Sequence, residues 1–212
     1  MRKYFAEAIG TFALVFCGTG AIIIDQQTNG AVGHIGIAIT FGLIVLCMVY
    51  TFGEISGAHL NPAVTIGFFI ANRFNKKEIA PYIISQIVGG IVASLVLHFL
   101  FSQNENLGAT NPNGSNSQSF ILEFILTFLL MLVILQVAHG SKETGIIAGI
   151  AIGSVVLLEA LFAGPISGAS MNPVRSLAPA IVSGDFHSLW IYLTAPFAGS
   201  ISAGLTWKAI KE

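Results

Sequence analysis

The sequence predicts an all-α transmembrane fold, with six membrane-spanning helices and two re-entrant half-helices arranged as an inverted repeat. Three observations support this prediction. Only 9% of the 212 residues are charged and 54% are hydrophobic, whereas about 25% of the residues in a soluble domain are charged. Six stretches are long and apolar enough to cross a bilayer, and the two halves of the chain share several motifs.

The predicted spans follow from length and hydropathy, because a spanning helix needs about 20 mostly apolar residues. Six stretches qualify, at about 4–24, 34–53, 79–101, 119–138, 145–163 and 187–207. The first is too long for a cleavable signal and does not end in a small-residue cleavage site. Two shorter apolar runs, at about 62–71 and 173–182, cannot cross a bilayer, and each begins with Asn-Pro.

The positive residues predict the orientation. With six spans, eight of the nine Lys and Arg residues lie on one side of the membrane: Arg2, Lys3, Arg73, Lys76, Lys77, Lys142, Lys208 and Lys211. The positive-inside rule then puts both termini in the cytoplasm, in an integral protein of the plasma or inner membrane. Arg175, just inside the second short run, is the exception.

The two halves of the chain repeat each other. Residues 6–12 resemble residues 122–128, and Ser56–Val64 resembles Ser167–Arg175. Each half reads span, span, short run, span. Three spans are an odd number, so the second half enters the membrane from the opposite side. We therefore expect one transmembrane domain over residues 1–212, with repeats at about 1–101 and 119–212.

The two short runs indicate where a pore would lie. Asn is a favoured N-cap and Pro a favoured first helical residue, so Asn61-Pro62 and Asn172-Pro173 predict two helix starts. The positive ends of these helices would meet at the midplane and repel cations. Irregular backbone at that depth must be buried or line a watery cavity. We therefore expect the preceding backbone to line the pore, at Gly57, Ala58, His59, Gly168 and Ser170.

The sequence lacks the signatures of several other classes of protein. The net charge of −1 shows no basic excess for binding nucleic acid. No metal-ligand spacing, HExxH or GxSxG motif occurs, so neither a metal, a cofactor nor an enzymatic activity is expected. The segment 102–118, rich in Asn and Ser, is expected to be a surface loop.

With these motifs the chain resembles the aquaporin, or major intrinsic protein, family over essentially its whole length. The resemblance is carried by the six spans, by the two Glu-x-x-x-Thr repeats, and by the boxes Asn61-Pro62-Ala63 and Asn172-Pro173-Val174. The second box departs from the usual Asn-Pro-Ala. The resemblance implies a homotetramer in membrane lipid that passes water and small neutral solutes. It also implies that Glu7 and Glu123 brace the loops before the half-helices.

By resemblance, four positions form a selectivity filter: Phe41, Ala160, Ala169 and Arg175. Water-selective members typically carry His at the position of Ala160. A methyl group there widens the constriction and removes a hydrogen-bond donor. The remaining site, an apolar wall opposite one guanidinium, suits a neutral solute with several hydroxyl groups.

The segment 164–173 is most similar to plant nodulin-type intrinsic proteins and their bacterial relatives. That subgroup includes channels for metalloid acids, glycerol, urea, ammonia and water. Ser176 and Ala180 instead resemble water channels, so a strictly water-selective channel is the alternative. An ion-coupled transporter is the less favoured reading, because no acid pair lies near the predicted midplane site.

Two further residues each have two possible roles. Glu159 adjoins Ala160 and either accepts backbone hydrogen bonds behind the filter or shapes the vestibule. His59 either gates the pore with pH or packs as a neutral ring, and packing is the favoured reading.

Overall fold

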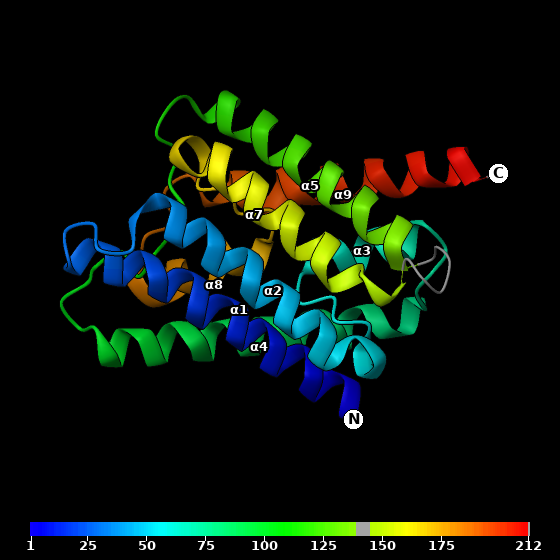
Figure 1. Cartoon of the computed structure of the whole chain (residues 1–212), viewed down its shortest axis with the longest axis horizontal. Helices are drawn as coiled ribbons and strands as arrows, with labels where there is room; N and C mark the ends of the chain where they lie inside the picture. The colour runs from blue at the N-terminus through cyan, green and yellow to red at the C-terminus, as the bar shows by residue number, and fades with distance from the viewer. Residues whose placement is uncertain (139–144, 212) are drawn as a thin grey trace.

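A computed structural model describes residues 1–138 and 145–211, and all the regular secondary structure of these residues is helical (Figure 1). Lys142, used above to predict orientation, lies outside these residues. The helices are α1 (Arg2–Gln27), α2 (Gly33–Ser56), α3 (Pro62–Ile70), α4 (Lys76–Leu100), α5 (Asn116–Ala138), α7 (Ala148–Ser167), α8 (Pro173–Ser183) and α9 (Leu189–Lys211). The all-α transmembrane prediction is confirmed.

Five of the described helices, α1, α2, α4, α5 and α7, are both long and apolar enough to cross a membrane. The sixth predicted span, α9, has the 23-residue length of α5 but a more polar sequence, with several Ser and Thr residues. At 1.5 Å per residue its length is about 35 Å, enough for a hydrocarbon core of about 30 Å.

The end of α7 differs from the prediction. The apolar stretch was expected to end near residue 163, but the helix continues past Pro165 to Ser167. Gly168 then ends it in the left-handed conformation, with φ 83°, and donates its N–H to the Gly164 carbonyl. Gly57 ends α2 in the same way, with φ 89°. Glycine suits both positions because a Cβ disfavours this conformation.

The long helices pack in the same pairs in both halves. Helix α1 packs on α2 and α4, while α5 packs on α7 and α9. Glycines allow two of these crossings, because a Cβ on Gly89 would collide with the Ala8 carbonyl, and one on Gly199 with the Phe124 carbonyl. The inverted repeat of the sequence is therefore also a repeat of packing.

The outer faces of the long helices are apolar. On α4, exposed hydrophobic side chains recur every three or four residues, at Ile84, Val88, Val92, Leu95 and Phe99. This spacing places them along one face of the helix. A stripe of this kind requires an apolar environment outside the protein.

The short helices α3 and α8 lie at opposite ends of the bundle (Figure 1). Both chain termini lie toward the end that holds α3 (Figure 1). Because α3 and α8 start near the middle and run outward, the loops before them meet inside the molecule. Their meeting point is the site described next.

Candidate functional site

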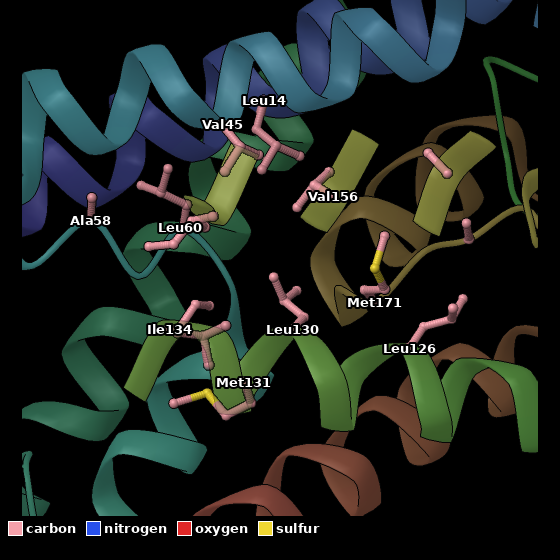
Figure 2. Packing of buried hydrophobic residues seen from close by; sticks show 14 of the residues in the cluster. Leu14, Val45, Ala58, Leu60, Leu126, Leu130, Met131, Ile134, Val156 and Met171 are labelled. Atoms are coloured by element: carbon pink, nitrogen blue, oxygen red, sulfur yellow. The ribbon is translucent and has the colours of Figure 1, made fainter. Parts of the chain in front are cut away.

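A cavity of about 850 Å³ runs through the middle of the bundle. Its wall consists largely of buried apolar side chains. Figure 2 shows several of them facing one space: Leu14, Val45, Leu60, Leu130, Ile134, Val156 and Met171. These come from α1, α2, α5, α7 and the two loops before the half-helices. The cavity extends from Phe41 and Arg175 to Tyr50 and Arg73.

Asn61 and Asn172 cap the two half-helices, as their sequence context predicts. Asn61 Oδ1 accepts the Ala63 N–H at 2.8 Å. Asn172 Oδ1 accepts the N–H groups of Val174 and Arg175, at 3.0 and 3.5 Å. Pro occupies the first position of each helix. Both half-helices therefore begin with a satisfied terminal N–H, in the middle of the molecule.

The two Asn residues also join the halves of the chain to each other. Asn61 Nδ2 donates to the Met171 carbonyl at 2.8 Å, and Asn172 Nδ2 donates to the Leu60 carbonyl at 2.9 Å. We call this reciprocal pair the Asn clasp. An amide nitrogen carries two hydrogens, so each Asn keeps one N–H beyond the clasp. Both Asn residues line the cavity.

Glu7 braces the loop before α3. Its carboxylate accepts the N–H groups of His59 and Leu60, at 2.9 and 2.7 Å. It also accepts hydrogen bonds from Ser56 Oγ at 2.7 Å and Gln86 Nε2 at 2.8 Å. Four donors on one buried carboxylate fix this loop in a single conformation.

Glu123 does the same in the second half of the chain. It accepts the N–H groups of Ser170 and Met171, at 2.9 and 2.8 Å, and a bond from Ser167 Oγ at 2.8 Å. A buried tyrosine supports each loop from behind: Tyr82 donates to the Ser56 carbonyl and Tyr192 to the Ser167 carbonyl. The expectation that both acids act as loop acceptors agrees with these contacts.

The braced loops contain strained backbone. Ala58 and Leu60 before α3, and Ala169 and Met171 before α8, all have positive φ, between 41° and 53°. Each non-glycine residue in this region costs about 1 kcal/mol or more. The hydrogen bonds to Glu7 and Glu123 hold this conformation.

The four predicted filter residues, Phe41, Ala160, Ala169 and Arg175, all line the cavity. Arg175 is 2% exposed, and its Nη1 donates to the Gly108 carbonyl at 2.8 Å. Its guanidinium carbon lies 5.1 Å from the centre of the Phe41 ring. Its Nε is buried without a hydrogen-bond partner in the described chain. One end of the cavity therefore combines a fixed cation, an aromatic ring and two methyl groups.

The residues predicted to line a pore with their backbone separate into two groups. Gly57, Ala58, His59 and Ser170 line the cavity, whereas Gly168 does not. The expectation for Gly168 therefore finds no support. Gly168 is the C-cap of α7, and a Cβ on it would contact Thr110 rather than open space.

The prediction of a surface loop over 102–118 is wrong for its middle part. Leu107 is 1% exposed and Thr110 is 6% exposed. Gly108 supplies the carbonyl for Arg175, and Thr110 Oγ1 donates to Ser176 Oγ at 2.7 Å. The available signal was the run Leu107-Gly108-Ala109-Thr110, which is less polar than the Asn and Ser residues around it. A buried arginine needs such a carbonyl partner.

His59 packs in an aromatic cluster. Its ring lies 4.6 Å from Phe68, 4.7 Å from Phe74 and 5.1 Å from Tyr82, measured between ring centres. Its Nδ1 is 3.1 Å from Thr65 Oγ1. This environment favours the packing interpretation over a pH gate.

Glu159 fits neither of its two interpretations. It is 1% exposed, and neither carboxylate oxygen has a hydrogen-bond partner among the described residues. It accepts no backbone bond behind the filter, and it is not part of the cavity lining.

Comparison with known proteins agrees with this geometry. Residues 1–207 match the family model described as "Major intrinsic protein". The chain is 44% identical to aquaporin NIP1-1 of Oryza sativa subsp. japonica and to nodulin-26 of Glycine max, each match covering 100% of this chain and 75% or 78% of the relative. Its fold matches the X-ray structure of the aquaglyceroporin from Plasmodium falciparum, with a TM-score of 0.89 and 27% identity, over 99% of this chain and 96% of that one. The chain therefore belongs to the major intrinsic protein family, and it is an integral membrane channel protein for water and small solutes.

Proposed function

We infer that the chain is a passive channel for water and small uncharged solutes, with glycerol, urea and metalloid acids such as boric or arsenous acid among them. Residues 1–212 would act as one channel domain. The observation that carries the proposal is the central cavity, at one end of which Arg175 and Phe41 face two alanines. The names of the relatives, aquaporins and an aquaglyceroporin, support water and glycerol among these solutes.

Solutes would be selected at Phe41, Ala160, Ala169 and Arg175. The guanidinium donates to solute hydroxyl oxygens, while the ring and the two methyl groups contact the carbon skeleton or the other face of the solute. The methyl group of Ala160 leaves this site wider than the imidazole of a histidine at the same position would. A small polyol or a trihydroxy acid gains hydrogen bonds on one side and apolar contact on the other.

Ions would be excluded by charge. Arg175 and the positive ends of α3 and α8 raise the electrostatic potential in the middle of the channel. A neutral solute passes the boxes Asn61-Pro62-Ala63 and Asn172-Pro173-Val174 by accepting the N–H groups that the Asn clasp leaves unused. A hydrated cation is repelled there by the positive helix ends.

The proposed channel lies in a plasma or inner membrane as a homotetramer, with both termini in the cytoplasm. The apolar outer faces of the helices supply the surface that lipid and neighbouring subunits would cover. The loop braces of Glu7 and Glu123 hold the pore-lining backbone in each subunit.

Swelling of proteoliposomes tests the proposal, with water, glycerol, urea and boric acid measured side by side. Wild type is expected to pass all four. Ala160→His is expected to keep water flux and suppress glycerol and boric acid, because the imidazole narrows the filter. Ala160→Val is the matched control. It adds bulk without a hydrogen-bond donor, so it distinguishes the effect of a narrower filter from the effect of an added polar group. Unchanged glycerol flux in Ala160→His would contradict the filter assignment.

Two other functions give different results in the same vesicles. A strictly water-selective channel would pass water and exclude the other solutes already in wild type. An ion-coupled transporter would accumulate a solute against its gradient when a proton or sodium gradient is imposed. Passive equilibration of glycerol without accumulation excludes both.

A further inference from the structure

A second, smaller pocket lies at the end of the bundle that holds α3 and the C-terminus of α9. Its volume is about 220 Å³, and its lining is Ala71, Asn72, Arg73, Trp207, Lys208 and Lys211. The motifs of the channel do not account for this pocket. Its lining comes from two segments that are far apart in the chain, the turn after α3 and the last turn of α9.

Backbone hydrogen bonds fix the first of these segments. At the end of α3 the N–H groups of Ala71 and Asn72 donate to the Gly67 and Phe69 carbonyls, and Arg73 N–H donates to the Phe68 carbonyl at 2.8 Å. Asn72 has the left-handed φ of 57° that reverses the chain here. The turn after α3 is thus fixed by backbone hydrogen bonds, and Arg73 extends from it toward α9.

Trp207 holds two of the three cations. The guanidinium carbon of Arg73 lies 5.1 Å from the centre of its ring, and Lys211 Nζ lies 5.3 Å from the same centre. Trp207 is 5% exposed. Two cations gathered on one aromatic ring, with Lys208 beside them, create a concentrated positive charge.

No carboxylate balances this charge in the described part of the chain. The ion pair found there joins Lys3 to Glu78 at 2.8 Å, and Glu78 also accepts a bond from Tyr4. The C-terminal ends of α3 and α9 each contribute about half a negative charge. These two partial charges amount to about one negative charge, beside the three positive side chains that line the pocket.

We propose that this pocket binds an anionic phosphate group, carried by a phospholipid headgroup or by a free phosphate compound. A phosphomonoester has a charge of about −1.5 to −2 near neutral pH, so Arg73, Lys208 and Lys211 attract it. Arg73 supplies a planar fork of N–H donors and the lysines supply point charges, the two usual modes of phosphate recognition. Basic pockets beside membrane helices recognise lipid headgroups in this way.

The pocket shares one residue with the channel. Arg73 lines both the small pocket and the central cavity. The next residue, Phe74, packs on the ring of His59, which also lines the cavity. An anion bound to Arg73 therefore changes the charge at the cavity mouth. This consequence rests on the proposed channel function, whereas the binding itself does not.

Binding is measured first, by native mass spectrometry of the purified protein titrated with phosphatidic acid, with phosphatidylcholine, and separately with inorganic phosphate. The test variant is Lys208→Gln/Lys211→Gln. The matched control is Lys76→Gln/Lys77→Gln, which removes the same charge from exposed residues on the other side of the turn after α3. Phosphatidic acid is expected to bind wild type and control alike, and the test variant about thirtyfold more weakly, since each lysine contributes a factor of about five.

The outcomes separate the sources of the phosphate and the two proposals. A thirtyfold loss for phosphatidic acid alone identifies a lipid site, and a matching loss for inorganic phosphate identifies a site for free phosphate. Equal losses in test and control variants, or equal binding of phosphatidylcholine and phosphatidic acid, would overturn the proposal. Glycerol flux into vesicles with and without phosphatidic acid then tests the effect on the channel, so a failed flux assay leaves the binding result intact.

Discussion

The braces of the two half-helices differ in one donor, and the difference shows how the halves have diverged. Glu7 accepts four hydrogen bonds, one of them from Gln86. Glu123 accepts three, because Pro196 occupies the repeat position that corresponds to Gln86. The first brace is therefore more completely paired than the second.

The side chains beyond the braces differ as well. In the first half, Thr65 accepts a hydrogen bond from Gln86 Nε2 and contacts His59 Nδ1, whereas Gln86 Oε1 has no hydrogen-bond partner among the described residues. In the second half, Ser176 Oγ contacts Ser170 Oγ and accepts a hydrogen bond from Thr110, in the loop between α4 and α5. Arg175 occupies the repeat position that corresponds to Val64 in the first half. The comparison teaches that one half is built mainly for rigidity, while the other carries the charge that faces the cavity.

The largest expected effect comes from removing the braces themselves. Each buried donor left without an acceptor costs about 1–3 kcal/mol. Glu7→Ala is therefore expected to lower the free energy of unfolding by about 4 kcal/mol or more, and Glu123→Ala by about 3 kcal/mol. Unfolding in mixed micelles, followed by tryptophan fluorescence, measures both. Glu105→Ala, in an exposed loop, is the control. A smaller loss of unfolding free energy in Glu7→Ala than in Glu123→Ala would contradict the inference that the first brace is the more completely paired one.

Removal of the cation in the second half is expected to affect ion exclusion. At about 5 Å and an effective dielectric constant of about 20, one positive charge repels another by about 3 kcal/mol. Arg175→Ala should therefore leak protons or cations about a hundredfold faster. A pH-sensitive dye inside proteoliposomes measures the leak. Arg175→Lys keeps the charge and should keep the exclusion, and an unchanged leak in Arg175→Ala would refute the assigned role.

The donor present only in the first half gives a smaller effect. Gln86 donates to the Glu7 carboxylate at 2.8 Å and to Thr65 at 3.1 Å. Gln86→Leu is expected to cost about 2 kcal/mol of unfolding free energy, because hydrogen bonds to charged groups contribute about 1.5–3 kcal/mol. The exposed Gln118→Leu should change stability by less than about 0.5 kcal/mol. Equal changes in unfolding free energy in the two variants would show that the Gln86 donor does not stabilise the first brace.

Glu159 gives the smallest expected effect and the opposite sign. Its carboxylate is buried without a hydrogen-bond partner in the described chain, which is unfavourable. Glu159→Met keeps much of the volume and is expected to raise the unfolding free energy by about 1 kcal/mol. Glu159→Ala, which leaves a cavity, separates the loss of volume from the loss of charge. A destabilised Glu159→Met would reveal a stabilising role for the carboxylate.

Much of this architecture could be predicted from the sequence because the bilayer constrains it strongly. Long apolar stretches specify the spanning helices, and Asn-Pro specifies both helix starts within one residue. The matching acids Glu7 and Glu123 could be assigned from the repeat together with the family resemblance. These signals are local or periodic, so one sequence contains them.

The features that escaped prediction depend on contacts between distant segments. The less polar run around Leu107 is only a weak sign that its loop turns inward, because the cause is the distant Arg175, which needs a carbonyl partner. The basic pocket joins Arg73 to Trp207 across most of the chain. Spacing within one segment carries no information about such partners.

The Asn clasp has a consequence for biosynthesis. Its hydrogen bonds join residues that are 110 and 112 positions apart. At a synthesis rate of about 5–20 residues per second, the Asn61 amide waits about 5–20 s before its partner emerges from the ribosome. Each half caps its own helix start, but the Asn61 amide cannot donate across the molecule until the second half has been made. The contact between the two loops at the channel centre therefore forms late in assembly.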